Sequence, residues 1–200
     1  MREHLKFKQL LNQFRSLKFE GEYMEDVLMH AHVDFDEACK EYMEENDMRT
    51  EDFTNEEVEH DAPPQEESGE IFETTPEPEE LRLFKKAHRK LVKILHPDRI
   101  RKNDSRKEEF TEDFKRMQEA IQNETWSDFF DLADKHHVKL DRIEEANRLL
   151  LEDISRISDK NDGKRKTFSW FLQQCNGDKD CRDNVVELFL RTKYGWVKPK

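Results

Sequence analysis

The stretch from Phe84 to Asp98, FKKAHRKLVKILHPD, constrains the fold most, because it predicts a helix with a fixed end. Apolar residues recur along it at three- and four-residue spacing, as expected for one stripe of a helix: they are Phe84, Ala87, Leu91 and Leu95. Pro97 has no backbone N–H and disfavours the α conformation for His96, so we expect the helix to end there. His96, Pro97 and Asp98 should then lie on a loop just beyond the helix.

A second helix is predicted after this loop. Ser105 and Glu108 fit a capping box, in which a hydroxyl and a carboxylate satisfy free N–H groups at a helix start. Beyond it, one apolar stripe follows: Phe110, Phe114, Met117 and Ile121. Two amphipathic helices joined by a short loop are expected to pack antiparallel, stripe to stripe. The loop that carries His96 should therefore lie at the tip of a helical hairpin.

This arrangement resembles the J-domain of DnaJ-type co-chaperones. KKAHRKLVKILHPD is similar to helix II and the following loop of that module, and FKRMQEAI, residues 114–121, is similar to its helix III. The resemblance covers residues 79–122. The usual first helix is absent or reduced to residues 70–72, and the chain has neither a Gly/Phe-rich linker nor a repeated CxxCxGxG zinc motif. The chain is thus identified as a divergent J-domain-like protein.

The resemblance implies a function and a binding site. Three loop residues would stimulate ATP hydrolysis by a DnaK-type chaperone: His96, Pro97 and Asp98. Four basic residues of the preceding helix would dock on the acidic surface of that chaperone: Lys86, Arg89, Lys90 and Lys93. The charge run itself favours an acidic protein over nucleic acid, for which no reading motif is present, and over a membrane, for which the helix lacks a bulky apolar face. The alternative is a helical adaptor or scaffold, viral for example, whose J-like fold is not coupled to a chaperone.

The composition favours several small helical units over one large core. Charged residues make up 41% of the chain and hydrophobic residues 34%, with few glycines and prolines, so the class expected is all-α. The net charge of −12 argues against general nucleic-acid binding. No apolar run is long enough to span a membrane, and no apolar signal core is present. Three cysteines make no disulfide framework, so we expect a reducing, cytoplasmic compartment.

Composition shifts divide the N-terminal part of the chain. Residues 1–50 predict a helical hairpin or three small helices, interrupted at Gly21 and capped again at Asp34. Residues 51–78 predict a disordered acidic linker, since the stretch up to residue 80 holds thirteen acids, four prolines and no Lys or Arg. The linker is interpreted as a solvated spacer, or alternatively as an acidic strap for the basic helix that follows.

Three further segments follow the linker. Residues 79–138 are expected to hold the J-like hairpin and a short helix over 123–138, which would replace the missing first helix. Residues 139–160 predict a long helix with a heptad-like seam and Asn147 at an a position. That pattern fits a parallel coiled-coil homodimer and a helix packed within its own chain equally well. Residues 161–200 predict an aromatic-rich helical hairpin, with helices over 167–174 and 183–193, the second of which is closed by Gly195.

The residues predict neither catalysis nor a bound metal or cofactor. No Gly-rich phosphate loop, nucleophile elbow or HExxH motif occurs in the sequence. His30 and His32 are two residues apart and so do not share a helix face. His136 and His137 are interpreted as favourable charges at a helix C-terminus. Cys175 and Cys181 flank a turn and would form a bridge only under oxidation.

Overall fold

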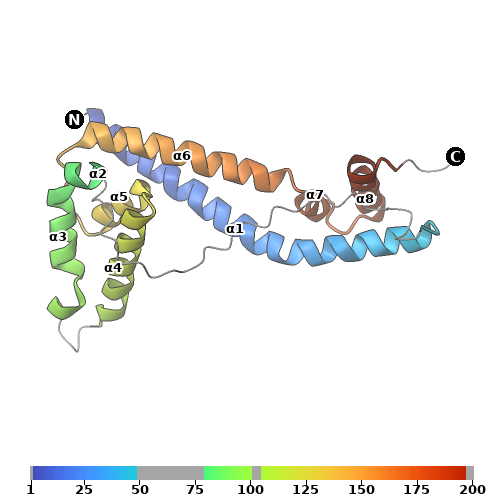
Figure 1. The fold of residues 1–200 in the computed structure, drawn as a ribbon, viewed down its shortest axis with the longest axis horizontal. Coiled ribbons are helices and arrows are strands. Elements are labelled where there is room, and N and C mark those ends of the chain that lie inside the picture. The colour runs from blue at the N-terminus through green and yellow to red at the C-terminus, as the bar shows by residue number, and fades with distance from the viewer. Residues whose placement is uncertain (1, 49–78, 101–104, 197–200) are drawn as a thin grey trace. The chain divides into compact units, whose positions relative to one another are not determined.

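The computed structural model describes residues 2–48, 79–100 and 105–196 (Figure 1). This part of the chain consists of helices joined by turns and contains no strand, which confirms the predicted all-α class. The acidic linker predicted at residues 51–78 lies outside the described residues. The last two acids of the acid-rich stretch, Glu79 and Glu80, belong to the first helix after it.

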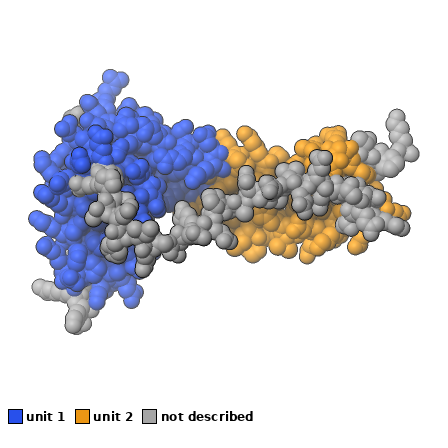
Figure 2. Space-filling model, viewed as in Figure 1, with its two compact units in different colours: residues 1–21, 74–160 blue, residues 22–73, 161–200 orange. Residues whose placement is uncertain are grey.

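The chain forms two compact units, coloured separately in Figure 2. Unit 1 comprises residues 1–21 and 74–160, and unit 2 comprises residues 22–73 and 161–200. Each unit is therefore assembled from two segments that lie far apart in the sequence. The sequence interpretation instead treated residues 1–50 as one separate region, because local patterns do not show which distant segments share a core.

The N-terminal region is one helix, α1 (Arg2–Glu45), so the predicted hairpin or set of three small helices is wrong. Gly21 lies inside this helix, where a glycine costs about 1 kcal/mol relative to alanine. That cost is small beside the burial of apolar side chains on both sides of it, such as Phe14 and Met24, at roughly 1.5–3 kcal/mol each. Asp34 also lies inside α1 and therefore caps no helix start; its carboxylate accepts a hydrogen bond from Gln173 Nε2 at 2.8 Å.

Unit 1 contains the predicted hairpin. Its helices after α1 are α2 (Glu79–Leu83), α3 (Lys85–Leu95), the 3-10 turn η2 (Pro97–Arg99), α4 (Lys107–Gln122), α5 (Trp126–Lys135) and most of α6 (Ile143–Arg165). Figure 1 shows α3 and α4 side by side, and their Cα atoms are in contact. The predicted capping box is wrong: α4 begins at Lys107, and its N-cap residue Arg106 makes no side-chain cap hydrogen bond.

The core of unit 1 is aromatic and includes the start of α1. Phe84 meets Phe130 edge to face with ring centroids 4.9 Å apart, and Phe7 of α1 meets the same Phe130 at 6.1 Å. Other core side chains come from α1, α3 and α4: Leu10, Leu11, Phe14, Leu91, Leu95 and Met117. The hairpin thus shares one core with α5, as expected, and with the start of α1, which was not expected.

The heptad-like seam of α6 packs within its own chain, one of the two interpretations left open by its sequence. Leu150 and Ile154 are buried in the core of unit 1. Asn147 is also buried, and its Nδ2 donates to Glu3 of α1, to the backbone oxygen at 3.3 Å and to Oε2 at 3.0 Å. The helix also runs from Ile143 to Arg165, instead of over the predicted residues 139–160.

Unit 2 contains the predicted C-terminal hairpin, formed by α7 (Phe168–Gln174) and α8 (Lys179–Tyr194). Its core combines them with the second part of α1: Phe35, Ala38, Tyr42, Leu172, Val186 and Leu190. Cys175 and Cys181 form a disulfide across the turn, with Cα atoms 5.5 Å apart. Gly195 ends α8 in the left-handed conformation, with φ of 66°, which glycine adopts without the steric cost of a Cβ.

Candidate functional site

The tip of the α3–α4 hairpin holds the His-Pro-Asp sequence in a defined turn. His96 closes α3 by donating its backbone N–H to Val92 O at 3.0 Å, and its extended ψ of 124° turns the chain away from the helix axis. Pro97 then starts the η2 turn, in which the N–H of Arg99 donates to His96 O at 2.9 Å. The chain therefore leaves α3 where the proline predicted.

His96 is held by contacts on two sides. Its ring lies edge to face against Phe114 of α4, with centroids 5.4 Å apart. Its Nδ1 accepts from the backbone N–H of Asp98 at 3.3 Å. The side chain of His96 remains 39% exposed and that of Asp98 is 90% exposed. The turn thus presents an oriented imidazole and a solvated carboxylate to solvent.

The four predicted basic residues lie on one face of α3, opposite its buried stripe. A helix turns by about 100° per residue, so they occupy a sector of about 100°: Lys86, Arg89, Lys90 and Lys93, all exposed. Lys86 Nζ contacts Asp141 Oδ2 at 3.2 Å, and both side chains are more than half exposed. Such surface pairs contribute little and exchange readily. The hairpin therefore brings a cationic face and the His96 turn onto one element.

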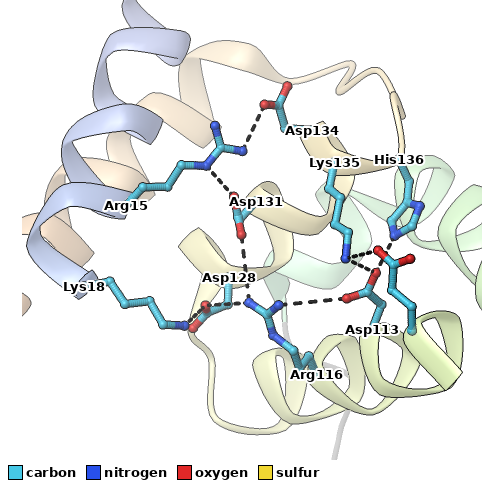
Figure 3. A network of polar contacts seen from close by, with 10 residues as sticks. Arg15, Lys18, Asp113, Arg116, Asp128, Asp131, Asp134, Lys135 and His136 are labelled. Carbon is cyan, nitrogen blue, oxygen red and sulfur yellow. Dashed lines mark hydrogen bonds and ion pairs between the residues drawn. The ribbon is translucent and has the colours of Figure 1, made fainter. Parts of the chain in front are cut away.

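A second feature of α4 is a buried carboxylate on the side that faces α5 (Figure 3). The side chain of Asp113 is only 3% exposed. It accepts from Lys135 Nζ at 2.7 Å and from His136 Nε2 at 2.8 Å, at the end of α5. Burial alone would raise the pKa of Asp113, but the hydrogen bonds from Lys135 and His136 outweigh it, so the pKa lies below its ordinary value.

The same network ties α1 to α5. Arg15 donates to Asp131 at 2.6 Å and to Asp134 at 3.1 Å, and Lys18 pairs with Asp128 (Figure 3). Burial would raise the pKa of Asp134, but its hydrogen bonds from Lys8 and Arg15 lower it overall. Three aspartates on one face of α5 therefore meet cations from α1. This network fixes the helices behind the hairpin, while the tip of the hairpin stays exposed.

Sequence reasoning located the turn and the cationic face, but it missed the residues that support them. Asp113 lies within the apolar stripe of α4, and a charge inside such a stripe was the available signal of a buried pair. His136 was assigned to the helix C-terminus; it does close α5, and its ring also bonds to Asp113. The contact of Phe114 with His96 had no sequence signal, because it depends on the packing angle of the hairpin.

Metal ligation and membrane spanning were the two further roles considered for the described residues. No group of three or more His, Cys, Asp or Glu in that part of the chain is arranged to hold a metal ion. Within the same residues, every helix is too short or too polar to cross a bilayer.

Comparisons with known proteins leave the family open. No family model, no curated protein and no solved structure matches the chain.

Proposed function

We propose that this chain is a J-domain-type co-chaperone, which binds a DnaK-type chaperone and stimulates its ATPase activity. The observation that carries the proposal is the combination of the His96 turn and the cationic face on one exposed hairpin. In this proposal the chain itself catalyses no reaction and needs no cofactor.

The packing around the turn supports this role. Phe114 and the Asp98 backbone N–H orient the imidazole of His96, so that a partner meets it in one conformation. Orientation before binding lowers the entropic cost of association. Arg89, Lys90 and Lys93 would steer the acidic surface of the chaperone toward the hairpin, an effect on association rate that salt weakens.

The experiment is a single-turnover ATPase assay with a bacterial DnaK. His96→Gln should abolish stimulation and leave the melting temperature nearly unchanged, because an exposed loop side chain contributes little to stability. His137→Gln, an exposed histidine in the same unit, is the matched control and should stimulate like the wild type. Failure of the wild-type chain to stimulate would favour the alternative, an adaptor or scaffold with a J-like hairpin.

A charge-reversal pair tests the docking face separately. Lys90→Glu combined with Lys93→Glu should weaken binding to the chaperone by about tenfold at low salt, and the difference should shrink as salt screens the charges. Lys115→Glu, on an exposed position of α4, changes the charge without touching this face and should have a much smaller effect. Equal losses of affinity for the α3 and α4 variants would mean that binding depends only on the net charge of the chain.

A further inference from the structure

The second half of α1 carries apolar side chains on its solvent side. Tyr23, Met29 and Val33 are 58–63% exposed, whereas Met24, Leu28 and Ala31 on the other side of the helix are buried in unit 2. A helix turns by about 100° per residue, so the three exposed side chains fall within a sector of about 120°. A helix of a soluble protein normally presents polar residues there, and clustered exposed apolar residues mark interaction sites.

The same sector is strongly acidic. It contains five exposed acids, Glu22, Asp26, Glu37, Glu41 and Glu44, together with His30 and a single basic residue, Lys40. Of these acids, Glu41 pairs with Arg182 of α8 at 3.7 Å. The described residues provide none of the other four carboxylates with a hydrogen bond or ion pair. Other acids of α1 bind groups of their own chain, Glu25 to Lys164 at 2.7 Å and Glu45 to Lys179 at 2.5 Å. The acids beside the apolar side chains are therefore available to a partner.

We propose that this surface, Tyr23, Met29 and Val33 with Glu22, Asp26 and Glu37, docks a basic amphipathic helix of another protein. The apolar side chains would pack against the apolar stripe of that helix, and the carboxylates would meet Lys or Arg beside the stripe, in the helix-on-helix mode of peptide recognition. A second copy of the surface is a poor occupant, because two acidic faces repel each other. The proposal does not depend on the chaperone function, since it uses no residue of the α3–α4 hairpin.

The test uses the full chain and a synthetic peptide of Leu and Lys, with Leu at three- and four-residue spacing. Calorimetry should show binding with a Kd on the order of 10 µM at low salt, weakened by added salt. A peptide with the same Leu positions and Glu in place of Lys is the control and should not bind. Equal binding of both peptides would overturn the role of the acidic residues, and no binding of the Lys peptide would overturn the proposal.

Two sets of variants locate the binding. Tyr23→Ser, Met29→Ser and Val33→Ser together should weaken binding at least about tenfold, because three apolar contacts are lost. Leu188→Ser, which removes an exposed apolar side chain from α8 in the same unit, should leave Kd unchanged. An equal loss of peptide affinity in the triple variant and in Leu188→Ser would overturn the assignment of the surface.

The charge variants remain informative if the triple variant misfolds. Asp26→Lys with Glu37→Lys should weaken binding about tenfold, whereas Glu144→Lys with Asp159→Lys, exposed acids of α6, should weaken it far less. Sedimentation of the chain without peptide gives a further check. Self-association that the triple variant removes would show that a second copy occupies the surface, and would overturn the proposal.

Discussion

The buried carboxylate of Asp113 allows the sharpest prediction about the hairpin. Asp113→Asn keeps the shape of the side chain and removes its charge. In the wild type this carboxylate accepts charge-assisted hydrogen bonds from Lys135 at 2.7 Å and His136 at 2.8 Å. Both donors contact the same oxygen, Oδ2, so the one oxygen of an asparagine can still accept both bonds, but as a neutral acceptor in place of a charged one.

The expected loss is about 2–3 kcal/mol of unfolding free energy. A hydrogen bond to a charged group contributes roughly 1.5–3 kcal/mol and one between neutral groups roughly 0.5–1.5 kcal/mol, so each of the two bonds should lose about 1–1.5 kcal/mol. The bond to Lys135 belongs near the lower end of that range, because the lysine side chain is 37% exposed and screened by water. The bond to His136 belongs nearer the upper end, since that side chain is only 8% exposed.

Urea unfolding followed by tryptophan fluorescence measures this loss in unit 1 alone. Trp126 is buried in the core of unit 1 and is the probe. Trp170 and Trp196 belong to unit 2, so both are replaced by phenylalanine in the reference protein and in every variant. Glu109→Gln is the matched control: Glu109 also bonds Lys135, at 2.8 Å, but is more than half exposed, so the change should be within about 0.5 kcal/mol.

Two results would refute the reasoning. An Asp113→Asn loss no larger than that of Glu109→Gln would mean that the carboxylate contributes no net stability. The pH dependence gives the second check. The pKa of Asp113 is lowered in the folded chain, so its stabilisation is present above the unfolded value of 3.8 and is lost as pH falls through the folded pKa. The difference between wild type and Asp113→Asn should therefore narrow at the acid end; a widening there would contradict the sign.

Three further predictions concern α6 and the C-terminal hairpin. Asn147→Leu should lower the unfolding free energy by about 1 kcal/mol, because it removes two hydrogen bonds to Glu3 and recovers only part of that loss by removing an Oδ1 that lacks a partner among the described residues. Sedimentation should show the same oligomeric state as the wild type, because the seam is covered by α1. Cys175→Ser with Cys181→Ser should lower the unfolding free energy of unit 2 by about 2 kcal/mol, because the unfolded chain gains entropy when the short disulfide loop is opened. Urea unfolding followed by the fluorescence of the unit 2 tryptophans measures this loss, and a reductant should reproduce it in the wild type. Gly195→Ala should lower the unfolding free energy by about 1 kcal/mol, and with it the melting temperature, because alanine is strained at a φ of 66°. Gly163→Ala should not lower the melting temperature, because Gly163 lies inside α6 with open space around it.

The sequence predicted the helix ends that depend only on neighbouring residues. The end of α3 at His96 follows from the ring of Pro97, and the end of α8 at Gly195 follows from the left-handed backbone there. Both conformations are set within a few residues of the chain.

The failures share a physical cause, namely that distant packing outweighed local preference. Gly21 and Asp34 looked like interruptions of α1, but apolar burial along the helix and a hydrogen bond to Gln173 hold them inside it. Asn147 fitted two kinds of seam, and only its contact with Glu3, far away in sequence, distinguishes them. The cationic face of α3 was predictable for the opposite reason, because it lies on the solvent side of its helix.

The discontinuous construction of unit 1 has a consequence during synthesis on the ribosome. Phe7, Leu10 and Leu11 are buried against helices that include Leu150 and Ile154, about 150 residues later in the chain. At about 5–20 residues per second, the apolar stripe at the start of α1 waits on the order of 10–30 s for its last packing partners to be made. Throughout that interval the nascent chain displays an apolar helix face, and it is then most exposed to aggregation and to capture by holding factors at the ribosome exit.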